Sequence, residues 1–187
     1  MTAQWVMDTS TFTHFHRAGV EDLLLQVAPH GSVVLIPAQV ETEIERGRDR
    51  YPSIPGIDNA QGYDRVFLTN DEYADMLTLQ IEMDPETPEQ HIGECAVIAC
   101  ATARKFVAVL DERVAFNEAL DRGLIVHDTI WILIACHVLA GVDRAVAEAA
   151  VDSLLETVMD LPINDGTSLF PYAYEIGYLP WEHGAAE

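Results

Sequence analysis

The chain has very little positive charge. Its 187 residues include 31 acidic side chains and 10 basic ones, Lys105 is the sole lysine, and the formal net charge is −21. Affinity for nucleic acid comes mostly from lysine and arginine side chains that neutralise phosphates, so the composition alone argues against nucleic-acid binding. An RNA substrate requires a further factor, such as a bound divalent cation that reverses the local charge. A high-salt habitat, where an acidic surface aids solubility, is a second explanation of the charge, and the sequence leaves both open.

The chain also lacks a long apolar run, a signal peptide and paired cysteines. Its longest apolar stretch, residues 130–140, is interrupted by His137 and is too short to span a bilayer, so we expect a buried helix there. The N-terminus has neither the basic region nor the apolar run of a signal peptide, and we expect a cytoplasmic protein. The three cysteines form no CxxC motif and the seven histidines no HExxH motif, which argues against disulfides and structural zinc.

Apolar strand-like segments alternate with amphipathic helical segments. We expect strands at 4–7, 32–36, 63–69, 106–110 and 124–126, helices at 20–25, 37–46, 70–82, 88–105, 112–121, 129–140 and 143–159, and an exposed loop at 48–62. Thr9, Ser10 and Thr11 are expected to cap a further helix. This alternation predicts an α/β domain with a parallel sheet covered on both faces.

Two aspartates follow predicted strands directly. Asp8 ends the run QWVMD, and Asp111 ends the run FVAVLD. Parallel sheets bind ligands beyond the carboxyl ends of their strands, at the point where the strand order reverses. Asp8 and Asp111 are therefore the first candidates for a functional site.

Glu94 lies on the apolar side of a predicted helix. In HIGECAVIACA it shares a stripe with Val97, Ile98 and Ala101 at helical spacing. Thr87 as N-cap, with Pro88 at the first helical position, would place Glu94 in the second turn, beyond the best reach of the helix dipole. A lone glutamate there has a simple explanation, namely that it borders the stripe and reaches water.

Glu43 repeats the pattern. In PAQVETEIERG it shares a stripe with Val40, Ile44 and Gly47, and we expect Gly47 to end this helix. Two acids at strand ends and two on inward helix faces could converge on one pocket. Four carboxylates would then repel one another and raise one another's pKa values. Oxygen ligands around Mg²⁺ or Mn²⁺ resolve that conflict.

In their order and spacing these motifs resemble those of PIN-domain ribonucleases, which include the toxins of toxin–antitoxin pairs. The matching segments are VMDTS with Asp8, PAQVETEI with Glu43, GECAVIACA with Glu94 and VLDERVAFNEALDRGL with Asp111. The segment HDTIWILIACHVLAGVDRAVAEAAVDSL looks like the C-terminal helices of a longer PIN subfamily. The resemblance covers nearly the whole chain.

The resemblance implies a three-layer α/β/α sandwich, with residues 1–187 forming one PIN-like domain and residues 141–187 a C-terminal helical extension packed on it. It implies Mg²⁺- or Mn²⁺-dependent cleavage of RNA, with Asp8, Glu43, Glu94 and Asp111 as catalytic and metal-binding residues. It also implies a homodimer and a small antitoxin partner.

Several other residues have a functional and a structural interpretation. Glu112 is a candidate fifth carboxylate, or simply an acid in the first turn of a helix. Ser10 is a candidate contact for a water or phosphate, although capping is the simpler role. Arg46 and Arg48, with Arg50 nearby, are candidate phosphate contacts or ordinary solvated arginines. Asp128 is predicted to be the N-cap of the next helix. These six residues are Ser10, Arg46, Arg48, Arg50, Glu112 and Asp128.

Two rival functions fit parts of the pattern. A phosphatase of the haloacid dehalogenase type also places an aspartate after its first strand, but it needs a second aspartate two residues later, where this chain has Ser10. A PIN-like module without activity could serve as an RNA-binding or protein-interaction scaffold. The four acidic residues argue against that alternative, and the net charge keeps it open.

Overall fold

The centre of the molecule is a five-stranded sheet in which every neighbouring pair of strands is parallel. The computed structural model describes residues 4–29, 31–83 and 86–180. The strands are β1 (Trp5–Met7), β2 (Val34–Pro37), β3 (Tyr63–Val66), β4 (Val107–Val109) and β5 (Val126–His127). Their order is β3-β2-β1-β4-β5, so the chain leaves β1 toward β2 on one side and reaches β4 on the other. The strand order therefore reverses beside β1 and β4.

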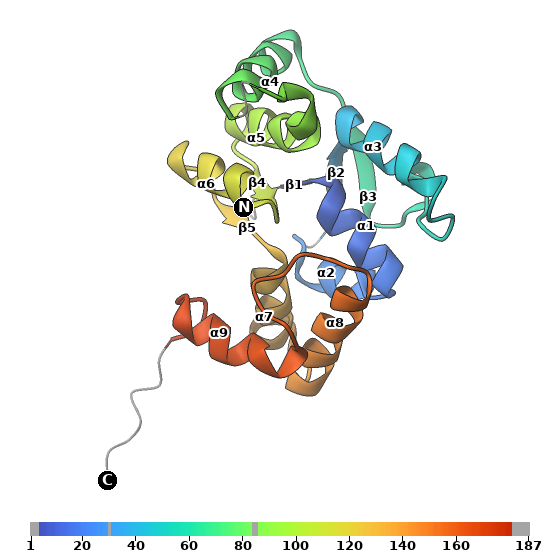
Figure 1. Cartoon of the computed structure of the whole chain (residues 1–187), viewed down its shortest axis with the longest axis vertical. Coiled ribbons are helices and arrows are strands. Elements are labelled where there is room, and N and C mark those ends of the chain that lie inside the picture. Colours follow the sequence, from blue (N-terminus) through green and yellow to red (C-terminus); the bar gives the residue numbers. More distant parts are fainter. Residues whose placement is uncertain (1–3, 30, 84–85, 181–187) are drawn as a thin grey trace.

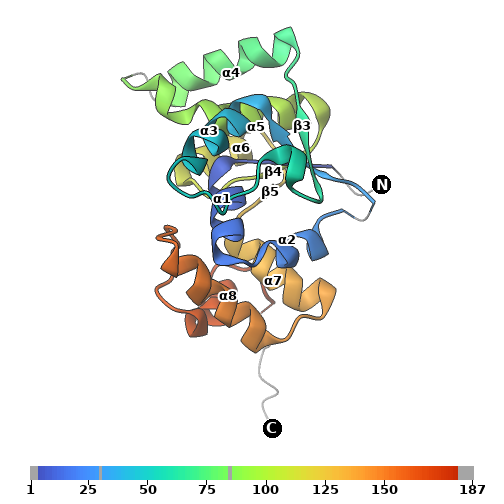
Figure 2. The same ribbon diagram turned by 90° about the vertical axis from the view of Figure 1, so that its right-hand side faces the viewer.

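Helices cover both faces of the sheet. The described residues form α1 (Thr9–Ala18), α2 (Glu21–Val27), α3 (Ala38–Arg48), α4 (Asn70–Met83), α5 (Ile92–Arg104), α6 (Arg113–Asp121), α7 (Thr129–Ala140), α8 (Arg144–Glu156) and α9 (Leu169–Glu175). Three short 3-10 turns span Ile57–Asn59, Pro88–His91 and Gly166–Ser168. Helices α4, α5 and α6 lie on one side of the strands, and α2, α7, α8 and α9 lie on the other (Figures 1 and 2). The chain has the three-layer α/β/α architecture that the sequence predicted.

The core forms where the apolar runs predicted it. All three residues of β1 and of β4 are buried, as parallel strands covered on both faces require. Helix α5 is buried from Cys95 to Ala101, so the predicted stripe of Val97, Ile98 and Ala101 does face the core. Helices α8 and α9 pack on α7, and α8 also packs on α1. Among the described helices none is long and apolar enough to cross a membrane.

Local predictions failed where a start or stop signal was misread. Helix α5 begins at Ile92, because Pro88–His91 forms a separate 3-10 turn. Helix α3 runs to Arg48, so Gly47 does not end it. The segment 48–62 is not simply an exposed loop, because Ile54 and Ile57 are 1% and 4% exposed and join the core. These apolar side chains anchor the segment that follows α3.

Candidate active site

Asp8 joins β1 to α1 without an intervening turn. Its side chain is 2% exposed and caps α1, because Oδ1 accepts a hydrogen bond of 3.0 Å from the backbone N–H of Thr11. The prediction that Thr9, Ser10 or Thr11 caps this helix was therefore wrong. The other carboxylate oxygen, Oδ2, accepts a hydrogen bond of 3.4 Å from the backbone N–H of Asp111. Asp8 and Asp111 thus meet at the carboxyl ends of the adjacent strands β1 and β4.

Asp111 is held by two threonines that the sequence did not connect with it. The hydroxyl of Thr11 donates to Oδ2 at 2.6 Å. Thr129 donates its backbone N–H to Oδ1 at 2.8 Å and its hydroxyl to Oδ2 at 3.0 Å. Both threonines are fully buried and lie in the first turns of helices that follow strands. The sequence signal that could have identified them is their position in the first turns of the helices that Asp8 and Asp128 cap.

Glu43 reaches the same edge from α3. The hydroxyl of Thr9 donates to its Oε2, and the backbone N–H of Gly93 donates to its Oε1 at 3.0 Å. A Cβ atom at position 93 would lie 2.7 Å from Oε2 of Glu43, so a larger residue would displace the carboxylate end of that side chain. Gly93 therefore fixes where the Glu43 carboxylate sits against the start of α5.

Glu94 lies in the first turn of α5, not the second, because the helix begins at Ile92. Burial raises the pKa of its carboxyl group, and the charges of Glu43 and Glu112 raise it further. A hydrogen bond from its own backbone N–H and the nearby His91 act in the opposite direction. The net effect is a glutamate whose negative charge is disfavoured by its surroundings.

The electrostatics of the four acids are linked. Burial raises the pKa of Asp8 well above its usual range, and the charges of Asp111 and Glu94 add to the effect. Burial also raises the pKa of Asp111, although hydrogen bonds from Thr11 and Thr129 oppose the rise. Within the described part of the chain, none of these acids forms an ion pair with arginine or lysine. The predicted quartet is thus a region of uncompensated negative charge.

The chemistry of this donor set suits a hard divalent cation, since all its ligands are carboxylate oxygens. In the arrangement of residues 4–29, 31–83 and 86–180, however, no three His, Cys, Asp or Glu side chains form a group that could hold a metal ion. Each of Asp8, Glu43 and Asp111 is instead held by hydroxyl or amide donors. Binding one ion with several of these carboxylates requires some of their side chains to rotate.

The two other acids near this edge cap helices. Glu112 caps α6, and its Oε2 accepts a hydrogen bond of 2.8 Å from the backbone N–H of Ala115. Asp128 caps α7, as predicted, through a bond of 2.7 Å from the N–H of Trp131. Its second oxygen accepts a hydrogen bond of 3.1 Å from the hydroxyl of Tyr178, and burial raises the pKa of Asp128 to about 6. One oxygen of Glu112 is free of this capping bond.

The polar residues suggested as RNA contacts differ in their surroundings. Ser10 is half-buried in the first turn of α1, beside Asp8. Arg48 is held within the molecule, since it pairs with Glu45 and donates to the carbonyl oxygen of Ile54 at 3.0 Å. Arg46 is exposed in the last turn of α3. Ser10 directly follows Thr9, whose hydroxyl donates to Glu43.

The structure is that of a parallel α/β protein whose candidate site is formed by carboxylates at the carboxyl ends of β1 and β4. The chain belongs to the PIN-domain family, because a family model described as a PIN domain matches residues 4–159. No curated protein matches the chain. The matched region includes the whole sheet and all four acids, and it gives the chain a nuclease-type fold. PIN domains are generally nucleases, and they typically use divalent metal ions.

Proposed function

We propose that the chain is a Mg²⁺- or Mn²⁺-dependent endoribonuclease. The observation that carries the proposal is the meeting of Asp8 and Asp111 at the carboxyl ends of β1 and β4, where burial and the charges of Asp111 and Glu94 raise the pKa of Asp8. Uncompensated buried charge costs stability, so its presence at a ligand-binding edge of the sheet has a functional rather than a structural explanation. Asp8, Glu43, Glu94 and Asp111 would hold the metal ion, with Glu112 available as a further oxygen ligand.

The residues around these acids have distinct tasks in this proposal. A bound divalent cation supplies a water of lowered pKa and stabilises negative charge on the phosphate and leaving oxygen. Thr11 and Thr129 orient the carboxylate of Asp111 through the hydrogen bonds described above. Gly93 and Thr9 position Glu43, and Ser10, in the first turn of α1, would contact an RNA phosphate beside Asp8. No side chain needs to act as a covalent nucleophile.

The direct test is cleavage of an end-labelled RNA that contains both a stem and a single-stranded loop. We expect fragments in Mg²⁺ or Mn²⁺, no fragments in excess EDTA, and recovery when the metal is restored. Asp8→Asn provides the matched control, since asparagine keeps an oxygen that caps α1 and replaces the second carboxylate oxygen with an amide nitrogen, which removes the charge. Full activity in excess EDTA would contradict the proposal. A protein that binds the RNA but never cleaves it would favour the inactive PIN-like module.

We also propose that the nuclease is the toxin of a toxin–antitoxin pair and that it forms a homodimer. An antitoxin that places a basic side chain against Asp8, Glu94 and Asp111 would relieve their repulsion and cover the site. Toxicity on expression, relieved by a neighbouring gene, is the expected result, and light scattering measures the oligomeric state. The absence of both a growth effect and a partner in a pull-down would contradict the toxin role while leaving the nuclease proposal intact.

A further inference from the structure

The arginines of this acidic chain are of two kinds. Among the described residues, five arginines form ion pairs with carboxylates: Arg48, Arg65, Arg104, Arg122 and Arg144. Arg17, Arg46, Arg50 and Arg113 form none there, and two of these four, Arg17 and Arg50, lie against one aromatic ring. Their guanidinium carbons are 3.8 Å and 5.2 Å from the centre of the Tyr51 ring. Two arginines without a carboxylate partner thus meet at one place in a chain of net charge −21.

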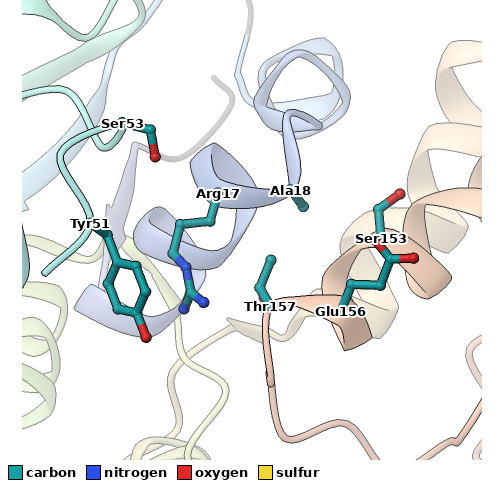
Figure 3. Close-up of a pocket in the computed structure, with 7 residues that line it drawn as sticks. All are labelled: Arg17, Ala18, Tyr51, Ser53, Ser153, Glu156 and Thr157. Carbon is teal, nitrogen blue, oxygen red and sulfur yellow. The ribbon is translucent and has the colours of Figure 1, made fainter.

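This place is also a pocket. A cavity of about 320 Å³ opens between the end of α1, the segment after α3 and the end of α8. It is lined by Arg17, Tyr51, Ser53, Ser153, Glu156 and Thr157. Figure 3 shows the Arg17 guanidinium beside the Tyr51 ring, with Thr157 on its other side. The volume falls at the lower end of the range for ligand pockets, and the hydroxyl groups suit a polar ligand.

The pocket and the acidic residues lie at opposite ends of one pair of helices. Thr9 of α1 donates to Glu43 of α3, and eight residues later in both segments Arg17 lies on Tyr51. The two segments therefore run side by side in the same direction. Eight residues of helix span about 12 Å, a distance that about four stacked nucleotides of a strand cover.

A polar stripe on α1 connects the two ends. Ser10, His14 and Arg17 follow one another at i, i+4 and i+7, so they share one face of the helix. His14 is joined to Thr157 of the pocket, with 2.5 Å between its Nδ1 and the threonine Oγ1. Burial lowers the pKa of His14 to about 4, and the charge of Arg17 contributes, so the imidazole is neutral at neutral pH. Positive charge on this face therefore comes from Arg17.

We propose that this pocket binds a phosphodiester of single-stranded RNA a few nucleotides from the scissile bond. The inference rests on the proposed ribonuclease function. Arg17, which lines the pocket, donates hydrogen bonds to the phosphate, and Arg50 adds positive charge from beside the pocket, where both guanidinium groups lie against the Tyr51 ring. The site acts locally, because charges beyond about 8 to 10 Å are largely screened at physiological salt. Glu156 lines the same pocket and weakens the binding by like-charge repulsion.

The test compares arginines at the pocket with an arginine far from it, which pairs with Glu148. Arg17→Gln removes one positive charge from the lining of the pocket, and Arg50→Gln removes one from beside the pocket, at the Tyr51 ring. Arg144→Gln makes the same change of charge at the first residue of α8, and Thr157 of the pocket follows the last residue of that helix. The 13 residues of α8 therefore separate the control from the pocket by about 20 Å. The probe is a short, fluorescently labelled single-stranded RNA of mixed sequence, its binding followed by anisotropy in EDTA. Cleavage by each protein is measured separately with Mn²⁺ under single-turnover conditions.

We expect Arg17→Gln to weaken RNA binding by about tenfold, as the loss of one charge-assisted contact would, and Arg144→Gln to change it by less than about twofold. Arg17→Gln should also make binding less dependent on salt, by about 0.7 in the logarithmic slope. Glu156→Gln should tighten binding, which a purely structural role of the pocket does not predict. In the cleavage assay, Arg17→Gln and Arg50→Gln should need more enzyme than the wild type to reach the half-maximal rate, while their maximal rate stays unchanged.

The two proposals fail separately. If the wild-type protein cleaves RNA but Arg17→Gln, Arg50→Gln and Arg144→Gln bind it equally, the pocket proposal is overturned and the nuclease stands. If the wild-type protein cleaves nothing and still binds RNA through Arg17 and Arg50, the pocket stands as a binding site and the nuclease proposal falls. Absence of any RNA binding overturns the pocket proposal. Thermal melts of each variant show whether a loss of RNA binding reflects unfolding. Arg50 is exposed, so Arg50→Gln provides a second variant that should fold normally.

Discussion

Glu72 and Glu94 occupy the same position in two neighbouring helices and have opposite electrostatic environments. Each is the third residue of its helix, and α4 packs against α5. Glu72 is 4% exposed and accepts hydrogen bonds from Arg104 at 2.6 Å and 2.8 Å and from the backbone N–H of Thr69 at 2.7 Å. These bonds, those from Arg104 above all, lower the pKa of Glu72 to about 2, whereas burial and Glu43 raise the pKa of Glu94.

The difference separates a structural carboxylate from a candidate ligand. A first-turn position favours negative charge in both helices, so the helix dipole does not explain the contrast. What differs is the partner: an arginine compensates Glu72, and other carboxylates face Glu94. A half-buried carboxylate that faces other carboxylates keeps its negative charge more easily when a cation from outside the chain compensates it, and a divalent cation is the ligand that suits it.

The largest expected effect is on activity, from Glu94→Gln. If Glu94 is a metal ligand, the substitution should lower RNA cleavage by at least about a hundredfold, since even residues that only support metal ligands contribute 10- to 100-fold. Without metal, the variant should melt at the same temperature as the wild type or higher, because like-charge repulsion is relieved. Stabilisation by Mn²⁺, which follows RT ln(1 + [L]/Kd), should become smaller. Cleavage assays and melts with and without Mn²⁺ measure all three.

One outcome would remove Glu94 from the site. A variant that melts lower than the wild type without metal, yet gains as much stability from Mn²⁺, would show that Glu94 is held by its own structural hydrogen bonds. Such a structural role would cost on the order of 1 to 3 kcal/mol in either condition.

The contrast between the two glutamates also shows how far the sequence could predict the fold. Helix α7 has the predicted bounds, 129–140, because local signals mark both ends: Asp128 caps it, and Gly141 ends it in the left-handed region at φ 72°. The start of α5 was missed because Thr87 and Pro88 begin a 3-10 turn instead of the helix. The end of a helix can be predicted well when the local residues favour a single structure. Thr87 and Pro88 favour the start of an α-helix and the start of a 3-10 turn equally, so the sequence did not decide between them.

The residues of the candidate site could be proposed from local patterns in part. Asp8 and Asp111 follow from the rule that ligands bind beyond strand ends, and Glu43 and Glu94 from polar residues on apolar stripes. The threonines that hold Asp111 were not predicted, because the contact from Thr11 joins residues 100 positions apart and that from Thr129 joins residues 18 apart. Arg17 was missed too, since its environment depends on Tyr51, which a separate segment supplies. Tertiary contacts of this kind leave no local pattern.

Glu72→Gln should show the reverse of Glu94→Gln, with a smaller effect that falls on stability. The substitution weakens the charge-assisted hydrogen bonds with Arg104, which is itself partly exposed, and should cost about 1 to 3 kcal/mol of unfolding free energy. Cleavage per folded molecule should be unchanged, because Glu72 belongs to the α4–α5 contact. Denaturant titration measures the loss, and Glu45→Gln is a control, since its exposed pair with Arg48 should contribute less than about 1 kcal/mol. Equal losses for the two variants would contradict a special role for the buried pair.

The smallest expected effect is the pH dependence of the two glutamates. The pKa of Glu72 is lowered in the folded protein, so its contribution to stability is fully present above the unfolded value, about 4.5, and is lost as the pH falls toward 2. The pKa of Glu94 is raised, so its ionised form destabilises the fold, and this penalty appears as the pH rises above the unfolded value.

In EDTA, the stability difference between wild type and Glu72→Gln should therefore stay constant near neutral pH and shrink below about pH 4.5. The difference for Glu94→Gln should have the opposite sign at neutral pH and shrink as the solution becomes mildly acidic. A single group changes the unfolding free energy by at most about 1.4 kcal/mol per pH unit, so denaturant titrations at closely spaced pH values are needed. Parallel pH profiles for the two variants would show that Arg104 and Glu43 do not set these carboxylates apart, and the electrostatic case for a metal site would lose its support.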